Sequence, residues 1–348
     1  MEIHAVMKQR LARPQALGLG PPGVHRAGRL PKIWSGGHRR QRGAAIITAL
    51  LVVTLAAVVV SALFYRESVA VRSIENRLAL SQTRWVERAA LDWAKVILRS
   101  DPALYDHATD VWGTPVVETQ LDETVTGGAK IGDSARNAFL AGSVVDAQAK
   151  FNVNTLVGSD GLPSKFHRDA MTKLMTLLGL PESLVQQALA RILKSRTTTL
   201  GDESVPASEI RLIQFGDLRD IPGFDDAVMQ ALQPHVTVLP DEMTTVNLNT
   251  ASAEVIAAMI PEAQLSAVKT FVIQRERLPL TTLSAASGRM GLDTTAQLNS
   301  RLLSVNTRFF WVNGLIRYDR VESQTETLVR RDSAGARGTI QVVWQHRT

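Results

Sequence analysis

The stretch RRQRGAAIITALLVVTLAAVVVSALFYRE, Arg39–Glu67, joins a basic segment, a glycine and a long uncharged run. From Ala44 to Tyr65 there are 22 residues with no charged residue, proline or glycine. As an α-helix this run rises about 33 Å, which is enough to cross a hydrocarbon core about 30 Å thick. The sequence therefore predicts a membrane-spanning helix at residues 44–65.

The charges beside this run predict its orientation. Arg39, Arg40 and Arg42 lie on its amino side, and the cytoplasmic flanks of membrane helices are enriched in Lys and Arg. We expect a single membrane pass, with residues 1–43 in the cytoplasm and the globular body in the periplasm or otherwise outside the cytoplasm. An ordinary cleaved signal peptide is the alternative, but its apolar region is only about 7–15 residues long.

Charge is distributed unevenly along the 348 residues, whose formal net charge is +6. Residues 1–43 hold nine of the 39 Lys and Arg residues and one of the 33 acidic residues, so residues 44–348 carry 30 bases and 32 acids, a net charge of −2. The body therefore has no surplus of positive charge that would attract nucleic acid. The absence of cysteine excludes disulfides, thiol catalysis and thiolate metal sites.

The helical pattern continues beyond the apolar run. Apolar residues recur mostly at every third or fourth position, and no proline occurs between Ala44 and Ser100. We predict one helix of about 55 residues that ends at Asp101-Pro102, with a membrane half at 44–65 and a periplasmic amphipathic half at 66–100. The stripe expected to bind partners consists of Ile74, Leu78, Trp85, Ala89 and Trp93. For the two tryptophans, packing in the protein's own core is the alternative.

Two short phrases in the body read almost alike, FNVNT at Phe151–Thr155 and VNLNT at Val246–Thr250. Each places Asn and Thr where an apolar strand ends, and their short polar side chains favour capping and turns over metal or sugar binding. Thr250 is the predicted cap of a helix at Ala251–Met259, with Glu254 in its first turn.

Between these phrases, short apolar-periodic segments separated by Gly and Pro predict an inserted all-helical domain at 158–236, including a helix at 206–215. The rest of the body comprises residues 101–157 and 237–348. The chain ends in alternating strands, with Asn313-Gly314 as a two-residue hairpin turn. The predicted fold class is α+β, a long N-terminal helix packed on an antiparallel sheet.

A glycine between basic residues and a long apolar run resembles the amino terminus of type IV pilins and type II secretion pseudopilins. In this class a prepilin peptidase cleaves after the glycine, which implies removal of residues 1–43, cleavage between Gly43 and Ala44, and methylation of the new amino terminus. Most members have a glutamate at the fifth mature position, where this chain has Thr48. In the fibres of this class, the glutamate of an incoming subunit is thought to lie beside the amino-terminal ammonium group of the subunit already in place. The first subunit of a fibre has no such neighbour, so Thr48 predicts a tip subunit or an initiator.

The order of phrases resembles a narrower family, the minor pseudopilin K of the type II secretion system. The resemblance is carried by Ala149–Leu156 (AKFNVNTL), Glu209–Ile213 (EIRLI), Val236–Pro240 (VTVLP) and Val246–Met259 (VNLNTASAEVIAAM), and it runs from about Gly43 to Trp344. It implies a minor pseudopilin, not an enzyme, that joins minor pseudopilins I and J at the pseudopilus tip. It also implies contact with the inner-membrane secretion platform and a role in exporting folded proteins across the outer membrane.

Some members of this family bind calcium through an acidic loop of the inserted domain. The corresponding stretch, LKSRTTTLGDESVPASE, offers only Asp202, Glu203 and Glu209. Calcium takes roughly six to eight oxygen ligands, often several of them carboxylates. We therefore expect no metal and no cofactor here.

Three other functions remain as alternatives. A minor pilin that primes a type IV pilus would have the same amino terminus. The stretch LRDIPGFD, Leu218–Asp225, suggests a membrane-anchored helix-hairpin-helix DNA-binding protein, but Asp225 and Asp226 would repel phosphate. An enzyme is the third, yet the histidines stand apart and form no catalytic motif; they include His107, His167, His235 and His346.

Overall fold

The computed structural model describes residues 42–102, 104–120, 138–196, 198–200, 203–240, 243–292, 298–318, 321–332 and 338–347. The predicted leader, 1–43, therefore lies outside the described residues except for its last two. The chain divides into two units, residues 1–67 and 68–348, and each is described by itself.

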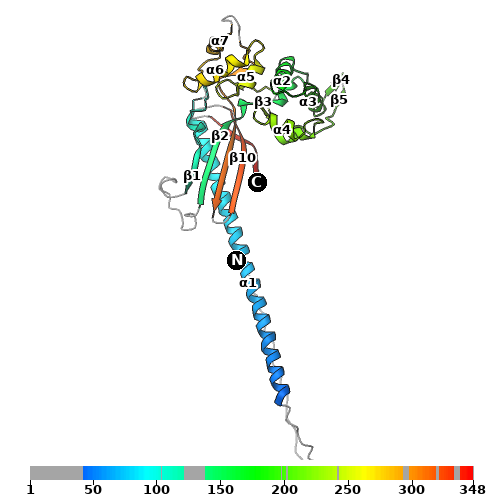
Figure 1. Cartoon of the computed structure of the whole chain (residues 1–348), viewed down its shortest axis with the longest axis vertical. Helices are drawn as coiled ribbons and strands as arrows, with labels where there is room; N and C mark the ends of the chain where they lie inside the picture. The colour runs from blue at the N-terminus through cyan, green and yellow to red at the C-terminus, as the bar shows by residue number, and fades with distance from the viewer. Residues whose placement is uncertain are drawn as a thin grey trace, which may run out of the picture. The chain divides into compact units, whose positions relative to one another are not determined.

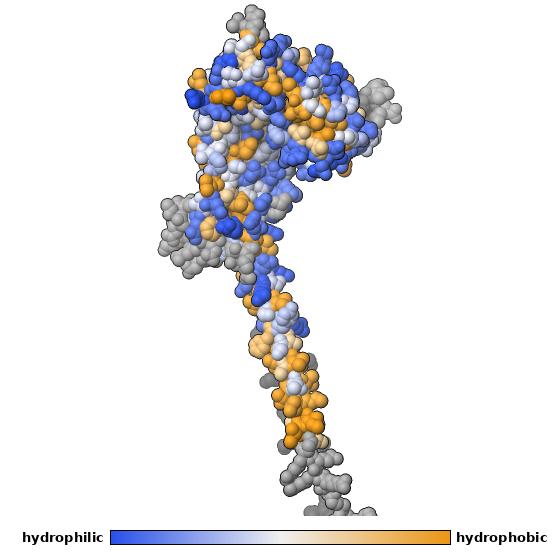
Figure 2. Space-filling model, viewed as in Figure 1, coloured by the Kyte–Doolittle hydropathy of each residue, from blue (hydrophilic) through white to orange (hydrophobic). Residues whose placement is uncertain are grey.

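Helix α1 (Arg42–Ser100) contains the whole apolar run (Figure 1). Its predicted end before Asp101-Pro102 is confirmed, because proline cannot continue a helix. In the first unit its apolar side chains are exposed, for example Leu55 at 60% and Phe64 at 72%, and Figure 2 shows an orange, hydrophobic surface along this part. Among the described residues, α1 is the one helix that is long and apolar enough to cross a membrane.

The second unit contains a five-stranded antiparallel sheet in the order β1-β2-β9-β10-β11. The strands are β1 (Val116–Gln120), β2 (Ala138–Asp146), β9 (Phe309–Tyr318), β10 (Val321–Arg331) and β11 (Ile340–Arg347). The second half of α1 packs on this sheet through Leu98, which shares a core with Phe310 and Val329. The predicted α+β fold, with its long helix on an antiparallel sheet, is confirmed.

The hairpin turn predicted at Asn313-Gly314 is wrong. Both residues lie inside β9, where Gly314 pairs with Gly142 of β2. A Cβ atom at position 314 would lie 2.9 Å from Oγ1 of Thr325, so the glycine permits a close cross-strand approach and does not form a turn. The adjoining ends of β9 and β10 are instead Tyr318 and Val321, which pair with each other.

The chain between β2 and β9 forms the helical part of the body. Its elements are η3 (Ala147–Ala149), β3 (Phe151–Asn152), η4 (Val153–Leu156), α2 (Lys165–Leu177), α3 (Ser183–Lys194), β4 (Thr198–Leu200), β5 (Glu203–Val205), η5 (Phe215–Asp220), α4 (Asp226–Leu232), β6 (Val236–Thr237), β7 (Val246–Asn247), α5 (Ala253–Met259), α6 (Leu265–Arg275), α7 (Ser284–Arg289) and β8 (Leu303–Ser304). One hydrophobic core runs through this part and includes Met171, Ile192 and Phe271. Helices therefore continue beyond the predicted domain at 158–236, whose boundaries stay a prediction.

The helix predicted at 206–215 is not present. Residues 206–214 form no helix, and the 3-10 helix η5 begins only at Phe215. Ile210 is 80% exposed, so the apolar periodicity of this segment does not mark a buried face. Its backbone is held differently, because the N–H groups of Ser208 and Glu209 both donate to the carbonyl of Lys194.

The two Asn phrases make equivalent hydrogen bonds to the backbone of a distant residue, Leu239 for the first phrase and Leu280 for the second. Asn152 accepts a hydrogen bond from the N–H of Leu239 at 2.9 Å, and Asn154 donates to the carbonyl of the same residue at 2.8 Å. Asn249 makes both bonds to Leu280, at 2.8 and 2.9 Å. In each phrase the first asparagine also accepts the N–H group two residues later, so the predicted capping and turn role is confirmed.

The cap predicted for the next helix is wrong by two residues. Helix α5 begins after Ser252, whose hydroxyl oxygen accepts a hydrogen bond from the N–H of Val255. Thr250 instead donates its hydroxyl to Asp146 at 2.5 Å. Asp146 is a buried carboxylate, and buried carboxylates need such donors. Glu254 lies in the first turn of α5, as predicted.

Candidate functional site

The part of α1 in the second unit turns one face toward the sheet. The buried residues of this face are Ala79, Thr83, Glu87, Ala94 and Leu98. Their spacings of four or seven residues put them on one side of the helix. Two are alanines, one is a threonine and one is charged, so this face is not the most hydrophobic one that the sequence offers.

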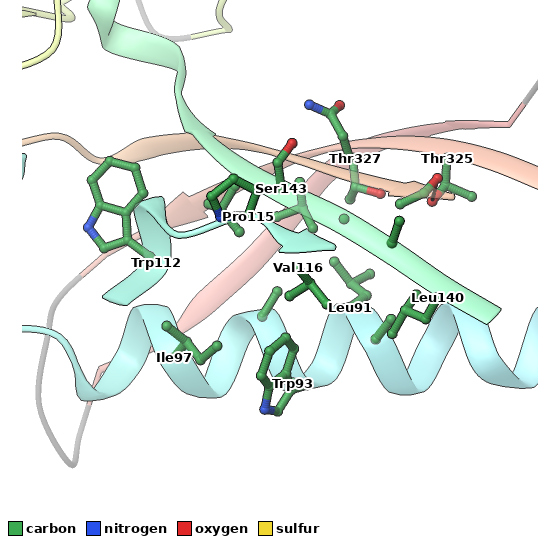
Figure 3. A pocket seen from close by; sticks show the side chains of 18 of the residues that line it. Leu91, Trp93, Ile97, Trp112, Pro115, Val116, Leu140, Ser143, Thr325 and Thr327 are labelled. Atoms are coloured by element: carbon green, nitrogen blue, oxygen red, sulfur yellow. Dashed lines mark hydrogen bonds between the residues drawn. The ribbon is translucent and has the colours of Figure 1, made fainter. Parts of the chain in front are cut away.

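A cavity of about 420 Å³ lies between α1 and the sheet (Figure 3). Leu91 and Ile97 of α1 and Leu140 of β2 contribute apolar wall, while Thr325 and Thr327 of β10 contribute hydroxyl groups. Small residues on both elements, including alanines of α1 and the paired glycines of the sheet, leave this space. Polar contacts near residues 87 and 101 join the helix to the sheet.

Glu87 forms the first of these polar contacts. Its carboxylate accepts a hydrogen bond from the hydroxyl of Ser323 in β10 at 2.6 Å and one from Nε of Arg347 in β11 at 3.1 Å. A second guanidinium nitrogen of Arg347 also bonds to it. The Glu87 side chain is 3% exposed, so these donors supply the stabilisation that a buried charge requires.

The second contact lies just beyond the end of α1. Asp106 is fully buried, and Nη2 of Arg331 in β10 lies 2.6 Å from both of its carboxylate oxygens. The Nη1 atom of Arg331 lies 3.2 Å from Asp101. Burial, reinforced by the nearby carboxylates of Asp110 and Asp106, raises the pKa of Asp101 to about 6. Asp101, Asp106 and Asp110 come within 4.8 Å of one another. Arg331 is the cation that pairs with Asp101 and Asp106, while Asp110 accepts a hydrogen bond from the backbone N–H of His107 at 2.8 Å.

The stripe predicted to bind partners is exposed on α1. Ile74, Leu78, Trp85 and Trp93 are between 53% and 67% exposed, and Ala89 is exposed as well. At about 100° per residue, most of the stripe lies roughly opposite the buried face. Neither tryptophan is buried in the described core, so the alternative of core packing is wrong. The partner-binding role itself stays a prediction.

The residues of the predicted processing site lie at the beginning of α1. Gly43 and Ala44 belong to its first turn. The hydroxyl of Thr48 donates to the carbonyls of Ala44 and Ala45, at 3.1 and 3.0 Å. Its polar group is therefore satisfied inside the helix, without any partner from another element.

Of the three acids considered for calcium, the structure describes the side chain of Glu209. Asp202 lies outside the described residues, as does the side chain of Glu203. Glu209 forms ion pairs with Arg191 at 2.6 Å and Lys194 at 3.5 Å. A carboxylate that already has two cationic partners does not fit the role of a calcium ligand.

Comparison with known proteins points to one family. Models of type II secretion system protein K match residues 149–241 and 246–306. The type II secretion system protein K of Pseudomonas aeruginosa is 28% identical over 246 residues, which cover 64% of this chain and 68% of that protein. The protein K of Pectobacterium carotovorum subsp. carotovorum is 24% identical over 306 residues, which cover 80% of this chain and 89% of that protein.

A solved structure shows the same fold. It is the crystal structure of the GspK-GspI-GspJ complex from the type 2 secretion system of enterotoxigenic Escherichia coli. One of its chains matches with a TM-score of 0.58 and 19% sequence identity, covering 79% of this chain and 98% of that chain. This likeness supports the combination of a long N-terminal helix, an antiparallel sheet and a helical region.

Proposed function

Because this chain belongs to the type II secretion system protein K family, we propose that it is the minor pseudopilin that initiates or caps the pseudopilus at its tip. In this role it takes part in the export of folded proteins across the outer membrane. The observation that carries the tip position is Thr48, which stands where fibre subunits of this class have a glutamate.

The energetics of an apolar environment explain why Thr48 matters. A charged side chain at the centre of a bilayer costs at least about 2.5 kcal/mol unless a partner offsets it. Thr48 has no charge that a partner must offset, and its hydroxyl is satisfied by the carbonyls of Ala44 and Ala45. A subunit with this residue needs no earlier amino terminus beside it, which suits the first subunit of a fibre.

Anchoring and processing follow the same proposal. Prepilin peptidase removes residues 1–43 by cleaving between Gly43 and Ala44, and the new amino terminus is methylated. The apolar run at 44–65 stays on the mature chain as a single pass of the inner membrane, and the body lies in the periplasm. The exposed apolar surface of this run supports a membrane pass. The arginines before the run support a cytoplasmic amino side and a periplasmic body.

The partners we propose are minor pseudopilins I and J, together with the inner-membrane secretion platform. The exposed stripe of α1, from Ile74 to Trp93, packs beside the equivalent helices of the two minor pseudopilins in a bundle. Each Leu, Ile or similar side chain that a partner covers completely contributes about 1.5–3 kcal/mol. A solved complex that contains GspK with GspI and GspJ supports this choice of partners.

Amino-terminal analysis of the mature protein tests the processing. We expect an N-methylated Ala44 in the wild type and an uncleaved precursor in Gly43→Arg. The control is Gly37→Arg, which changes a leader glycine away from the junction and leaves cleavage intact. A mature chain that begins at Val71, as after an ordinary signal peptide, or a Gly43→Arg variant of mature size contradicts the proposal.

A further inference from the structure

Beside its apolar stripe, α1 carries a row of positive charges. The row consists of Arg77, Arg84, Arg88, Lys95 and Arg99, and we call it the basic row. Within it, Arg77, Arg88 and Arg99 are 11 residues apart, as are Arg84 and Lys95. Eleven residues make about three helical turns, so these side chains stay on one side of the helix over about 33 Å.

The basic row occupies one flank of the apolar stripe. At about 100° per residue it lies between the stripe, represented by Ile74 and Trp85, and the buried face. The other flank carries Glu75 and Gln82 and has no cation at these positions. Positive charge therefore borders the stripe on a single side.

The chain's own contacts do not explain the basic row. Among the described residues, its single ion pair joins Lys95 to Asp92 at 3.0 Å, and no carboxylate pairs with its four arginines. All four arginines are exposed. Like charges four residues apart, such as Arg84 and Arg88, destabilise an isolated helix. The row thus opposes the stability of the helix that carries it.

We propose that the basic row is the electrostatic part of the partner interface, and that it fits a partner helix whose apolar stripe is flanked by Asp or Glu. The matching carboxylates recur at intervals of four and seven residues, as the cations do. This inference rests on the proposed function, which supplies a helical partner. Charges that flank an apolar seam set the choice and orientation of paired helices.

The geometry favours a helix over a membrane surface as the acidic partner. A helix that lies on a membrane has cations distributed over the polar face opposite its apolar side. Here the opposite face is buried against the sheet and carries the acid Glu87, whose partners come from the sheet. The guanidinium of Arg88 also lies 5.6 Å from the ring centre of Trp85, which places this cation at the edge of the stripe.

Charge reversal in the full-length, detergent-solubilised chain tests the inference. The test variant is the triple change Arg77→Glu, Arg84→Glu and Arg88→Glu, and a milder variant has Gln at the same positions. The control is Arg72→Glu, an exposed arginine of α1 outside the row. Affinity for minor pseudopilins I and J is measured at increasing NaCl, and circular dichroism checks that the helix is retained.

We expect the triple reversal to weaken binding at least about ten-fold at low salt, with a smaller loss for the Gln variant. Arg72→Glu should stay within about two-fold of the wild type, because it lies off the row. High salt should reduce the difference, since it screens exposed charges. Changing the flanking carboxylates of the partner helix to Arg should restore binding of the triple variant.

Failure of the inference and failure of the proposed function give different results. If the wild type binds neither pseudopilin, both are overturned. If the wild type binds and the triple reversal binds equally well at low salt, the inference alone is overturned. It is also overturned if the triple reversal keeps its partner affinity but loses adsorption to phosphatidylglycerol vesicles, since the row would then serve a membrane surface.

Discussion

Replacing Asp101 by asparagine is expected to stabilise the body at neutral pH, although the change removes one side of an ion pair. Burial and two neighbouring carboxylates raise the pKa of Asp101 from 3.8 to about 6, even with Arg331 beside it. Between about pH 4 and pH 6 the folded chain therefore keeps a proton that the unfolded chain has released. The stability contributed by this group falls as the pH rises through that window. Asparagine does not titrate, so the variant lacks this loss of stability.

The magnitude follows from the size of the pKa change. A difference of about two pH units corresponds to roughly 3 kcal/mol, at about 1.36 kcal/mol per unit. The Asp101 side chain is 10% exposed, and solvent screening reduces this figure to about 1–2 kcal/mol. Asp101→Asn should thus match the wild type near pH 4 and exceed its free energy of unfolding by about 1–2 kcal/mol above pH 7.

Urea unfolding of the full-length chain, followed by tryptophan fluorescence at pH 4 and pH 7.5, measures this difference. The comparison must be between variants, because the pKa of His167 is lowered to about 4 by burial and its contribution to stability rises with pH. Asp92→Asn is the matched control, since that side chain is 61% exposed and should change stability by less than about 0.5 kcal/mol. A variant at Asp101 that is less stable than the wild type at pH 7.5 would refute the reasoning.

Three further predictions concern Arg331, Asn249 and Trp85. Arg331→Met should cost about 3–5 kcal/mol in urea unfolding, because it leaves the buried Asp106 unpaired; a loss below about 1 kcal/mol contradicts this. Asn249→Ala should cost about 1–3 kcal/mol by the same measurement, since it leaves the backbone of Leu280 unsatisfied, and an unchanged midpoint argues against that role. Trp85→Glu should leave the free energy of unfolding unchanged, because this side chain is 67% exposed. The same change should reduce retention by tagged minor pseudopilins at least about ten-fold, and retention equal to that of the wild type would contradict partner binding by the stripe.

Features that depend on neighbouring residues could be predicted from the sequence. The end of α1 follows from Asp101-Pro102, and the continuity of the helix follows from the absence of proline before it. The turn role of the Asn phrases follows from their short side chains. Each of these depends on bonds between residues a few positions apart.

Features that depend on distant partners could not be predicted. Asn313-Gly314 is a favourable turn sequence, but pairing with β2 and β10 draws it into a strand. Thr250 could cap a helix, but the buried carboxylate of Asp146 takes its hydroxyl. In both cases a tertiary contact outweighs a sound local preference.

The candidate site shows the same limit. Periodicity located the exposed stripe of α1, but it could not show that the sheet covers another face, marked by Ala79, Glu87 and Ala94. The contacts that join α1 to the sheet connect residues far apart in the chain. Arg331 lies 225 residues from Asp106, and Arg347 lies 260 residues from Glu87. No local sequence pattern predicts such long-range ion pairs.

Immunogold labelling of isolated pseudopili tests the central claim most directly. The claim is that the mature chain keeps its apolar helix and lies at the tip of the fibre. We predict label at one end of each fibre, on a chain whose amino terminus is Ala44. Label distributed along the length of the fibres would contradict the account.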